Sequence, residues 1–255
     1  MSTTIASITA EAKRLGWSWV IGYRILKRFG IKDVRFRPRG LSTPIYVRIE
    51  GSDIYEYKQS LGSWAEPLRL PFTPRTIVDL GANVGYTALR WAKEFPNAKI
   101  IAVEPAKANL LQFEKNCGSS YQNISVIRGA VWPRSVLLRI ADLGADHNAF
   151  QMVEDVADGN IQGITIPQLM GLYALERIDL LKVDIEGGEL PLFNDPSARE
   201  WLRHVGVVLI ETHDRMILGC SEAVRRAMEG LGKRQGDINE YEYWVLNDCI
   251  DRVRL

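Results

Sequence analysis

The sequence predicts an α/β fold, with a mostly parallel, doubly wound β-sheet and helices on both faces. Two observations support this prediction. From Pro71 onward, short apolar segments of strand length alternate with amphipathic segments of helical period, and crossover helices of this kind cover both faces of a parallel sheet. In addition, the apolar segment at 77–80 enters a glycine-rich turn before a helical segment, an arrangement typical of nucleoside-binding βαβ units.

Length and composition fit one folded domain with an appendage. The chain has 255 residues, of which 46% are hydrophobic and 25% charged, and its net charge of +1 gives no general attraction to nucleic acid. We expect an N-terminal extension at 1–70 and a main domain at 71–255. Three widely spaced cysteines, Cys117, Cys220 and Cys249, favour reduced thiols over a disulfide framework or a zinc site. No apolar run approaches the roughly 20 residues of a membrane span, and the N-terminus lacks a secretory signal pattern, so we expect a cytoplasmic protein.

The expected N-terminal extension is basic, since residues 1–40 hold nine Lys or Arg and only two acids. Apolar residues at helical spacing predict one or two helices at 4–29. Two interpretations stay open. The helices either bind the inner face of an anionic membrane or a lipid-linked acceptor, or form a cap that packs on the main domain or on a second subunit. Alternating apolar residues at 45–49 and 54–57, separated by Glu-Gly-Ser-Asp, then predict a β-hairpin.

The main domain is expected to contain parallel strands at 76–80, 99–103, 124–127, 178–183 and 206–212, interleaved with helices at 84–95, 106–117, 167–174 and 219–230. Further strand-like segments at 136–141 and 241–246 predict antiparallel edges of this sheet. The polar, aperiodic stretch at 142–162 is long for a compact domain. It is either a substrate lid or a plain surface loop.

The glycine-rich turn favours one nucleoside ligand over another. A dinucleotide site places Gly-x-Gly-x-x-Gly against a pyrophosphate, but here the middle glycine is Asn83, and Asp79 precedes the turn. A carboxylate repels a pyrophosphate and suits the ammonium and sulfonium charges of S-adenosylmethionine. We therefore expect the methionine part of this donor at Asp79 and at the turn residues Gly81, Asn83, Val84, Gly85 and Tyr86.

Two later strand ends complete the expected donor site. Glu104 lies about 20 residues beyond the turn, where a carboxylate accepts both ribose hydroxyls, and Pro105 follows it. Ala130 and Val131 follow the third strand, where an adenine ring needs a slot and a backbone partner.

Charged residues gather at the ends of the last two parallel strands. Lys182, Asp184 and Glu186 alternate at the end of the fourth strand, and Glu211 and His213 do so at the end of the fifth. Charges that face one way are costly to bury unless they are paired or used, so we expect the five groups to converge beside the donor. The structural alternative is that Lys182 pairs with an acid and Glu186 caps the following helix.

These residues carry a resemblance to a known family. The segment 77–104, the element Lys-x-Asp-x-Glu-Gly-x-Glu at 182–189 and the segment 209–214 resemble the FkbM family of S-adenosylmethionine-dependent methyltransferases, over about the last two-thirds of the chain. The resemblance implies a Rossmann-like class I methyltransferase fold. It also implies O-methylation, commonly of a sugar hydroxyl or a natural product, with S-adenosylhomocysteine as the by-product.

Methyl transfer to a hydroxyl needs alignment and a proton acceptor. We expect His213 to be the general base, because imidazole titrates near neutral pH, with Glu211 or Asp214 orienting its ring. Asp184 is the rival base. A divalent metal at Asp184, Glu211 and Asp214 is a further option that no spacing demands, so no metal is expected.

We expect the acceptor to be a saccharide or glycoconjugate, with a small natural product as the alternative. A nucleic-acid acceptor is not expected, because amino-group methyltransferases commonly carry Asn/Asp-Pro-Pro-Tyr after the fourth strand, where this chain has Asp-Ile-Glu-Gly. Two other classes compete. An NAD-dependent oxidoreductase is disfavoured by Asn83 and Asp79, and a non-catalytic donor-binding module has no use for desolvated charges.

Overall fold

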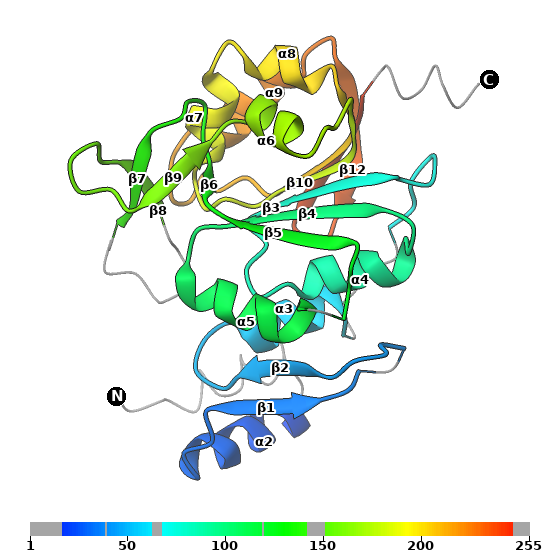
Figure 1. Cartoon of the computed structure of the whole chain (residues 1–255), viewed down its shortest axis with the longest axis vertical. Helices are drawn as coiled ribbons and strands as arrows, with labels where there is room; N and C mark the ends of the chain where they lie inside the picture. Colours follow the sequence, from blue (N-terminus) through cyan, green and yellow to red (C-terminus); the bar gives the residue numbers. More distant parts are fainter. Residues whose placement is uncertain (1–16, 39, 63–67, 119, 142–150, 247–255) are drawn as a thin grey trace. The chain divides into compact units, whose positions relative to one another are not determined.

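The structure is a computed structural model that describes residues 17–38, 40–62, 68–118, 120–141 and 151–246. It divides into two compact units, Met1–Ala65 and Glu66–Leu255 (Figure 1). No helix within these described ranges is long and apolar enough to cross a membrane.

The first unit contains helix α2 (Trp17–Arg28), strands β1 (Asp33–Phe36) and β2 (Ile45–Arg48), and helix α3 (Asp53–Ser60). The part of the expected helical segment before residue 17 lies outside the described residues. The expected hairpin is wrong, because β2 pairs with β1 and the segment after it is helical. Asp53 is fully buried at the start of α3, where its carboxylate accepts hydrogen bonds from the backbone N–H and the guanidinium of Arg48 at 2.8 and 2.6 Å. These bonds tie the end of β2 to the first turn of α3.

The second unit is built on a seven-stranded sheet with the order β12-β13-β11-β10-β3-β4-β5. Its parallel strands are β3 (Thr76–Leu80), β4 (Lys99–Glu104), β5 (Ile124–Arg128), β10 (Ile178–Val183) and β11 (Val205–Ile210). These are the five strands that the sequence predicts. Strand β13 (Tyr241–Leu246) is antiparallel to β11, as expected, and β12 (Gly232–Ile238) forms the outer edge.

Helices cover both faces of this sheet. Figure 1 shows α4 (Tyr86–Glu94) and α5 (Lys107–Cys117) on one face, and α6 (Ile166–Leu172), α7 (Glu189–Asn194), α8 (Ala198–Leu202) and α9 (Cys220–Met228) on the other. The sequence predicts α4, α5, α6 and α9. It misses α7 and α8, because helices of six and five residues are too short for an apolar period to show. The expected Rossmann-like α/β fold is confirmed.

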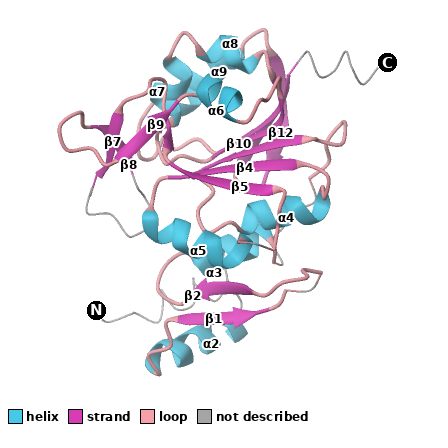
Figure 2. Ribbon diagram, viewed as in Figure 1, coloured by secondary structure: helices cyan, strands magenta, loops and turns pink. Residues whose placement is uncertain are grey.

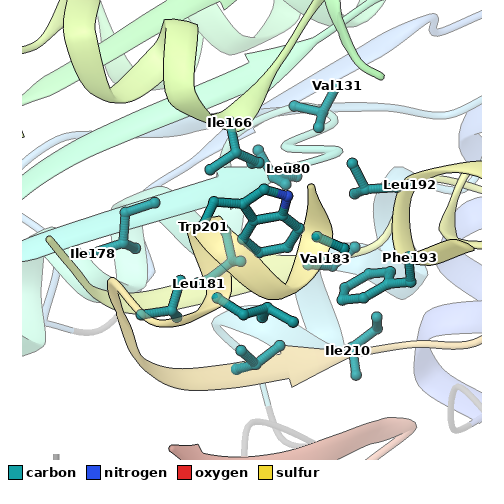
Figure 3. Packing of buried hydrophobic residues seen from close by; sticks show 14 of the residues in the cluster. Leu80, Val131, Ile166, Ile178, Leu181, Val183, Leu192, Phe193, Trp201 and Ile210 are labelled. Carbon is teal, nitrogen blue, oxygen red and sulfur yellow. The ribbon is translucent and has the colours of Figure 1, made fainter. Parts of the chain in front are cut away.

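The core on the second face fixes the direction of the site residues. Leu80, Val183 and Ile210, the last residues of β3, β10 and β11, are fully buried in this core, where the rings of Phe193 and Trp201 meet edge to face at 5.7 Å (Figure 3). Side chains alternate along a strand. The residue before each of these therefore points to the opposite face of the sheet, where Asp79 pairs in register with Lys182.

A smaller four-stranded sheet has the order β6-β9-β7-β8 (Figure 2). Its strands are β6 (Ala130–Val131), β7 (Leu137–Ala141), β8 (Gln151–Glu154) and β9 (Ile161–Ile164). The expectation that the segment 136–141 forms an edge of the main sheet is therefore wrong. Leu138, Met152 and Ile161 are buried in a cluster of their own, which explains why β7 pairs with β8 and β9 instead. The expected lid or loop at 142–162 is wrong for its second half, which is folded into β8 and β9, and residues 142–150 lie outside the described residues.

Candidate active site

Strand β3 ends in a tight turn that is pressed against the end of β10. Gly81 has a φ of 76°, and a Cβ added there would lie 1.7 Å from the carbonyl oxygen of Asp184, so only glycine fits. Asn83 also has a positive φ, 49°, which asparagine tolerates better than most residues. Gly85 begins α4 with a φ of 88°, and a Cβ there would meet Cys117 Sγ at 2.6 Å. Close packing therefore requires both glycines of the turn.

Glu104 joins the end of β4 to this turn. Its carboxylate is 4% exposed and accepts hydrogen bonds from the backbone N–H groups of Asn83 and Ala106, each at 2.9 Å, and from Asn109 Nδ2 at 3.1 Å. Burial raises the pKa of Glu104, and these hydrogen bonds oppose the rise. A carboxylate offers about four acceptor positions, so most of its capacity is already used. The observed role of Glu104 is to fix the turn, and its expected contact with ribose stays a prediction.

Asp79 acts on the same turn through Lys182. The Asp79 carboxylate is fully buried, and its partner among the described residues is Lys182, whose Nζ lies 3.2 Å from Oδ1. Burial raises the pKa of Asp79, while Lys182 lowers it. The same ammonium donates to the carbonyl oxygen of Gly81 at 3.1 Å. Asp79 has unused acceptor capacity but no exposed surface, so its direct contact with a donor ammonium also stays a prediction.

The remaining expected donor residues contribute mainly to packing. Val84 and Tyr86 are buried at the start of α4. Val131 belongs to the main core and Ala130 to the core of the smaller sheet, so their side chains do not form an open slot. Pro105 is half-buried beside Glu104. An adenine contact at Ala130 and Val131 would have to come from backbone atoms, and it stays a prediction.

Five charged groups meet at the ends of β10 and β11, as expected from the sequence. Lys182 Nζ lies 3.3 Å from Asp184 Oδ2. His213 Nε2 lies 3.4 Å from Glu186 Oε2, 3.5 Å from Glu211 Oε1 and 3.8 Å from Asp184 Oδ1. The strand does not continue to Glu186, since β10 ends at Val183 and Glu186 has a φ of 52°. The turn nevertheless returns its carboxylate to the cluster.

Glu189, a residue absent from the expected site, holds His213 from the other side. It is fully buried at the start of α7, and its carboxylate accepts hydrogen bonds from the backbone N–H groups of Ile185 at 3.1 Å and Gly187 at 3.0 Å. His213 Nδ1 lies 3.0 Å from Glu189 Oε1. Both oxygens of Glu189 already accept backbone N–H groups, an arrangement that favours a proton on Nδ1 of His213, and Nε2 faces the cluster.

The surroundings of His213 shift its pKa away from the near-neutral value of free imidazole, and its expected role as general base stays a prediction. Burial lowers the pKa of its imidazole, but the hydrogen bond and charge of Glu189, with the charges of Asp184 and Glu186, outweigh burial and raise that pKa to about 9. The pKa values of two neighbours are also raised, chiefly by burial and by the charge of Asp184, to about 7 for Glu186 and about 8 for Glu211. The raised pKa favours the imidazolium form of His213 at neutral pH, which has no free ring nitrogen to accept a proton.

Two further residues differ from expectation. Asp214 does not orient His213, because its carboxylate accepts hydrogen bonds from the backbone N–H groups of Gly219 and Ser221 at 3.1 and 2.9 Å. It serves the start of α9 instead. Tyr241, which the sequence reasoning missed, donates its hydroxyl to Asp184 Oδ2 at 2.9 Å. The feature that could have indicated Tyr241 is its position on β13, the antiparallel strand next to β11. That position becomes clear only when the strand order is known.

A family model decides the family. The model of the methyltransferase FkbM domain matches residues 79–234, from the strand before the glycine turn to the strand after α9. The chain belongs to the FkbM methyltransferase family. This match spans the turn, Glu104 and all five charged groups, whereas Tyr241 lies beyond the matched residues.

Relatives of this FkbM protein share limited identity with it. AMB antimetabolite synthetase AmbE of Pseudomonas aeruginosa is 24% identical over 68% of this chain, which spans 10% of the relative. Methyltransferase 1 of Beauveria bassiana is 22% identical over 49% of this chain and 59% of its own length. A crystal structure of methyltransferase FkbM from Methylobacillus flagellatus KT is 14% identical, with a TM-score of 0.40 over 72% of this chain and 46% of that one. The chain thus spans 10% of the length of the Pseudomonas aeruginosa relative and 59% of the length of the Beauveria bassiana relative.

Proposed function

We propose that the protein transfers a methyl group from S-adenosylmethionine to a hydroxyl oxygen of a saccharide or glycoconjugate. The observation that carries the proposal is the juxtaposition of two features in one FkbM domain: a glycine turn fixed by Glu104, and a charged cluster around His213. Lys182 joins the two, because it contacts both Gly81 and Asp184. Such strand ends are where open α/β sheets bind ligands.

The turn fits the donor better than a dinucleotide. Gly81 and Gly85 bring bare backbone to the end of β3, and Lys182 fixes that backbone through the Gly81 carbonyl. The nearest carboxylates, Asp79 and Glu104, disfavour a pyrophosphate at this place. S-adenosylmethionine supplies an electrophilic methyl group on a sulfonium. The residues of the chain would align donor and acceptor and receive the hydroxyl proton.

The acceptor side consists of carboxylates that are partly open to solvent. The side chains of Asp184, Glu186 and Glu211 are 19%, 31% and 15% exposed. Carboxylates accept hydrogen bonds from neighbouring hydroxyl groups, which a saccharide presents in series. This pattern supports a polyol acceptor, and it gives the hydroxyl proton a place to go other than His213.

A small natural product is the second candidate acceptor. The relative from Pseudomonas aeruginosa is named as an antimetabolite synthetase, and this chain covers one-tenth of it. The name supports a role in secondary metabolism without specifying a hydroxyl.

A screen with methyl-labelled S-adenosylmethionine tests the acceptor. Free sugars, nucleotide sugars, glycolipid headgroups and matched non-sugar alcohols are incubated with the full chain, and products are read by mass and fragmentation. We expect one label on a sugar oxygen. Label only on the non-sugar alcohols would support the natural-product acceptor, and label only on nitrogen would contradict O-methylation.

A further inference from the structure

The cluster around His213 has a property that the donor site does not explain. One ligand atom from each of Asp184, Glu186 and His213 lies within 4.8 Å of the other two. The oxygens around His213 Nε2 lie 3.4 to 3.8 Å away, longer than an ordinary N–H···O hydrogen bond of about 2.9 Å. Two atoms that bind one cation at about 2.1 Å lie about 3.0 Å apart in octahedral geometry and about 3.4 Å apart in tetrahedral geometry. The observed spacing is closer to the spacing of shared ligands than to direct hydrogen bonds.

The orientation of His213 is that of a metal ligand. Its ring is 1% exposed, and Nδ1 is engaged by Glu189, whose carboxylate is itself fixed by two backbone N–H groups. A carboxylate that holds one ring nitrogen and directs the other at a cation is the usual outer-shell partner of a metal-binding histidine. Glu189 therefore serves two purposes at this fully buried position, since it supports the turn at 185–187 and directs Nε2 of His213 at the cluster.

The charge of the cluster favours a cation. Four carboxylates surround His213: Asp184, Glu186, Glu189 and Glu211. Against them stand the imidazolium of His213, whose Nε2 proton a bound metal ion would displace, the Lys182 ammonium, which also pairs with Asp79, and Arg215, which is 77% exposed and 3.8 Å from Glu211 Oε1. An exposed pair at this distance contributes little. The buried excess of negative charge is costly unless a further cation offsets it.

The atoms that face the centre remain available. Lys182 and Tyr241 contact Asp184 through Oδ2, whereas Oδ1 faces His213. One imidazole with several carboxylates suits Mn²⁺ and similar divalent ions better than Ca²⁺, which prefers oxygen ligands alone. We propose that Asp184 Oδ1, Glu186 Oε2 and His213 Nε2 bind one divalent transition-metal ion of the Mn²⁺ type, beside Glu211.

The metal site goes beyond the proposed methyl transfer, and only its catalytic role rests on that function. Partial exposure of Glu186 and Glu211 leaves positions at which a hydroxyl oxygen can join the cation. A cation that binds this oxygen lowers the pKa of its proton, so that a neighbouring carboxylate can accept it. With a cation at this site, methyl transfer to a hydroxyl does not require a histidine as general base.

The test is titration of the EDTA-stripped full chain with MnCl₂, with free Mn²⁺ followed by electron paramagnetic resonance. We expect one ion per chain. The isosteric variants Asp184→Asn and Glu186→Gln should each weaken binding at least tenfold, and Glu189→Gln should weaken it by about 10- to 100-fold through the ring of His213. Glu200→Gln, an exposed carboxylate on α8, is the matched control and should bind as the wild type does.

Thermal melts of each stripped variant separate loss of the site from loss of the fold. Absence of stoichiometric Mn²⁺ binding by the wild type would overturn the proposal, as would unchanged binding by Asp184→Asn and Glu186→Gln. Donor binding is measured on the same samples. Mn²⁺ binding without donor binding would contradict the proposed function alone, and donor binding without Mn²⁺ binding would contradict the metal site alone.

Discussion

Among single residues, Glu189 is the one on which the arrangement of the site depends most. It is fully buried, and its carboxylate holds the ring of His213 together with the N–H groups of Ile185 and Gly187 in the preceding turn. The turn needs this support, because Glu186 and Gly187 both have positive φ values, 52° and 94°. One carboxylate thus fixes the ring and the backbone that brings Glu186 to it.

We predict that Glu189→Ala lowers the free energy of unfolding by about 3–5 kcal/mol, because it leaves a buried cation and two backbone donors without their acceptor. Urea unfolding in the presence of chelator, followed by circular dichroism, measures the change. The surface variant Glu200→Ala should stay within about 0.5 kcal/mol of the wild type. A Glu189→Ala variant as stable as this control would show that the Glu189–His213 contact does not support the fold.

For single residues, the sequence predicts which charged side chains lie close together better than it predicts their individual hydrogen-bond partners. Alternation after two neighbouring strands correctly brings Lys182, Asp184, Glu186, Glu211 and His213 together. It does not reveal that Glu189 folds back from a helix start, because the contact depends on a turn with positive φ. It also gives no protonation state, since the pKa of His213 depends on its burial and on Glu189, Asp184 and Glu186, which come from another segment of the chain.

Among the elements, helix α2 has a surface that suits a lipid bilayer. Ile21 and Ile25 in the helix and Phe29 directly after it recur at every fourth position and are 54%, 52% and 78% exposed. Lys27 and Arg28 lie in the last turn of the helix. Exposed apolar side chains beside basic ones are typical of helices that lie on anionic membranes.

We therefore predict that the full chain sediments with vesicles that contain phosphatidylserine, less with neutral vesicles, and less in high salt. Ile25→Asp should abolish most of this binding, because it places a charge in the apolar face. Leu172→Asp changes a residue of α6 that is 67% exposed and should have no effect. A different result would favour packing of α2 on a second subunit. In that case the chain binds neither kind of vesicle, forms dimers, and the dimers dissociate in Ile25→Asp.

The elements that the sequence predicts well are those with a long, one-sided apolar pattern. The ranges of β3 and β10 agree with the predicted ones, and those of β4, β5 and β11 differ by one or two residues. The hairpin fails because Ile54-Tyr-Glu-Tyr alternates as a strand does, while Asp53 begins a helix through its contact with Arg48. The prediction of a loop after residue 150 fails because β8 and β9 bury few side chains each. Their sequences therefore show little alternation of apolar and polar residues.

For the molecule as a whole, the strand order brings the site together. The neighbours β3, β10 and β11 end side by side, so the glycine turn, Lys182 and Glu211 lie at one edge of the sheet although they are far apart in the chain. The regular alternation of strands and helices predicts a parallel sheet. The second, smaller sheet could not be predicted, because its pairing depends on which apolar residues form a separate cluster.

The central claim is that the turn after β3 binds S-adenosylmethionine, and calorimetric titration of the full chain tests it most directly. We predict that S-adenosylmethionine and S-adenosylhomocysteine each bind at one molecule per chain, while NAD does not bind. Glu104→Gln should weaken donor binding about tenfold or more, because it loses a charge-assisted contact worth about 1.5 to 3 kcal/mol. Glu114→Gln, an exposed carboxylate on α5, should bind as the wild type does. Binding of NAD in place of S-adenosylmethionine, or equal donor affinity in the folded Glu104→Gln variant and the wild type, would contradict the account.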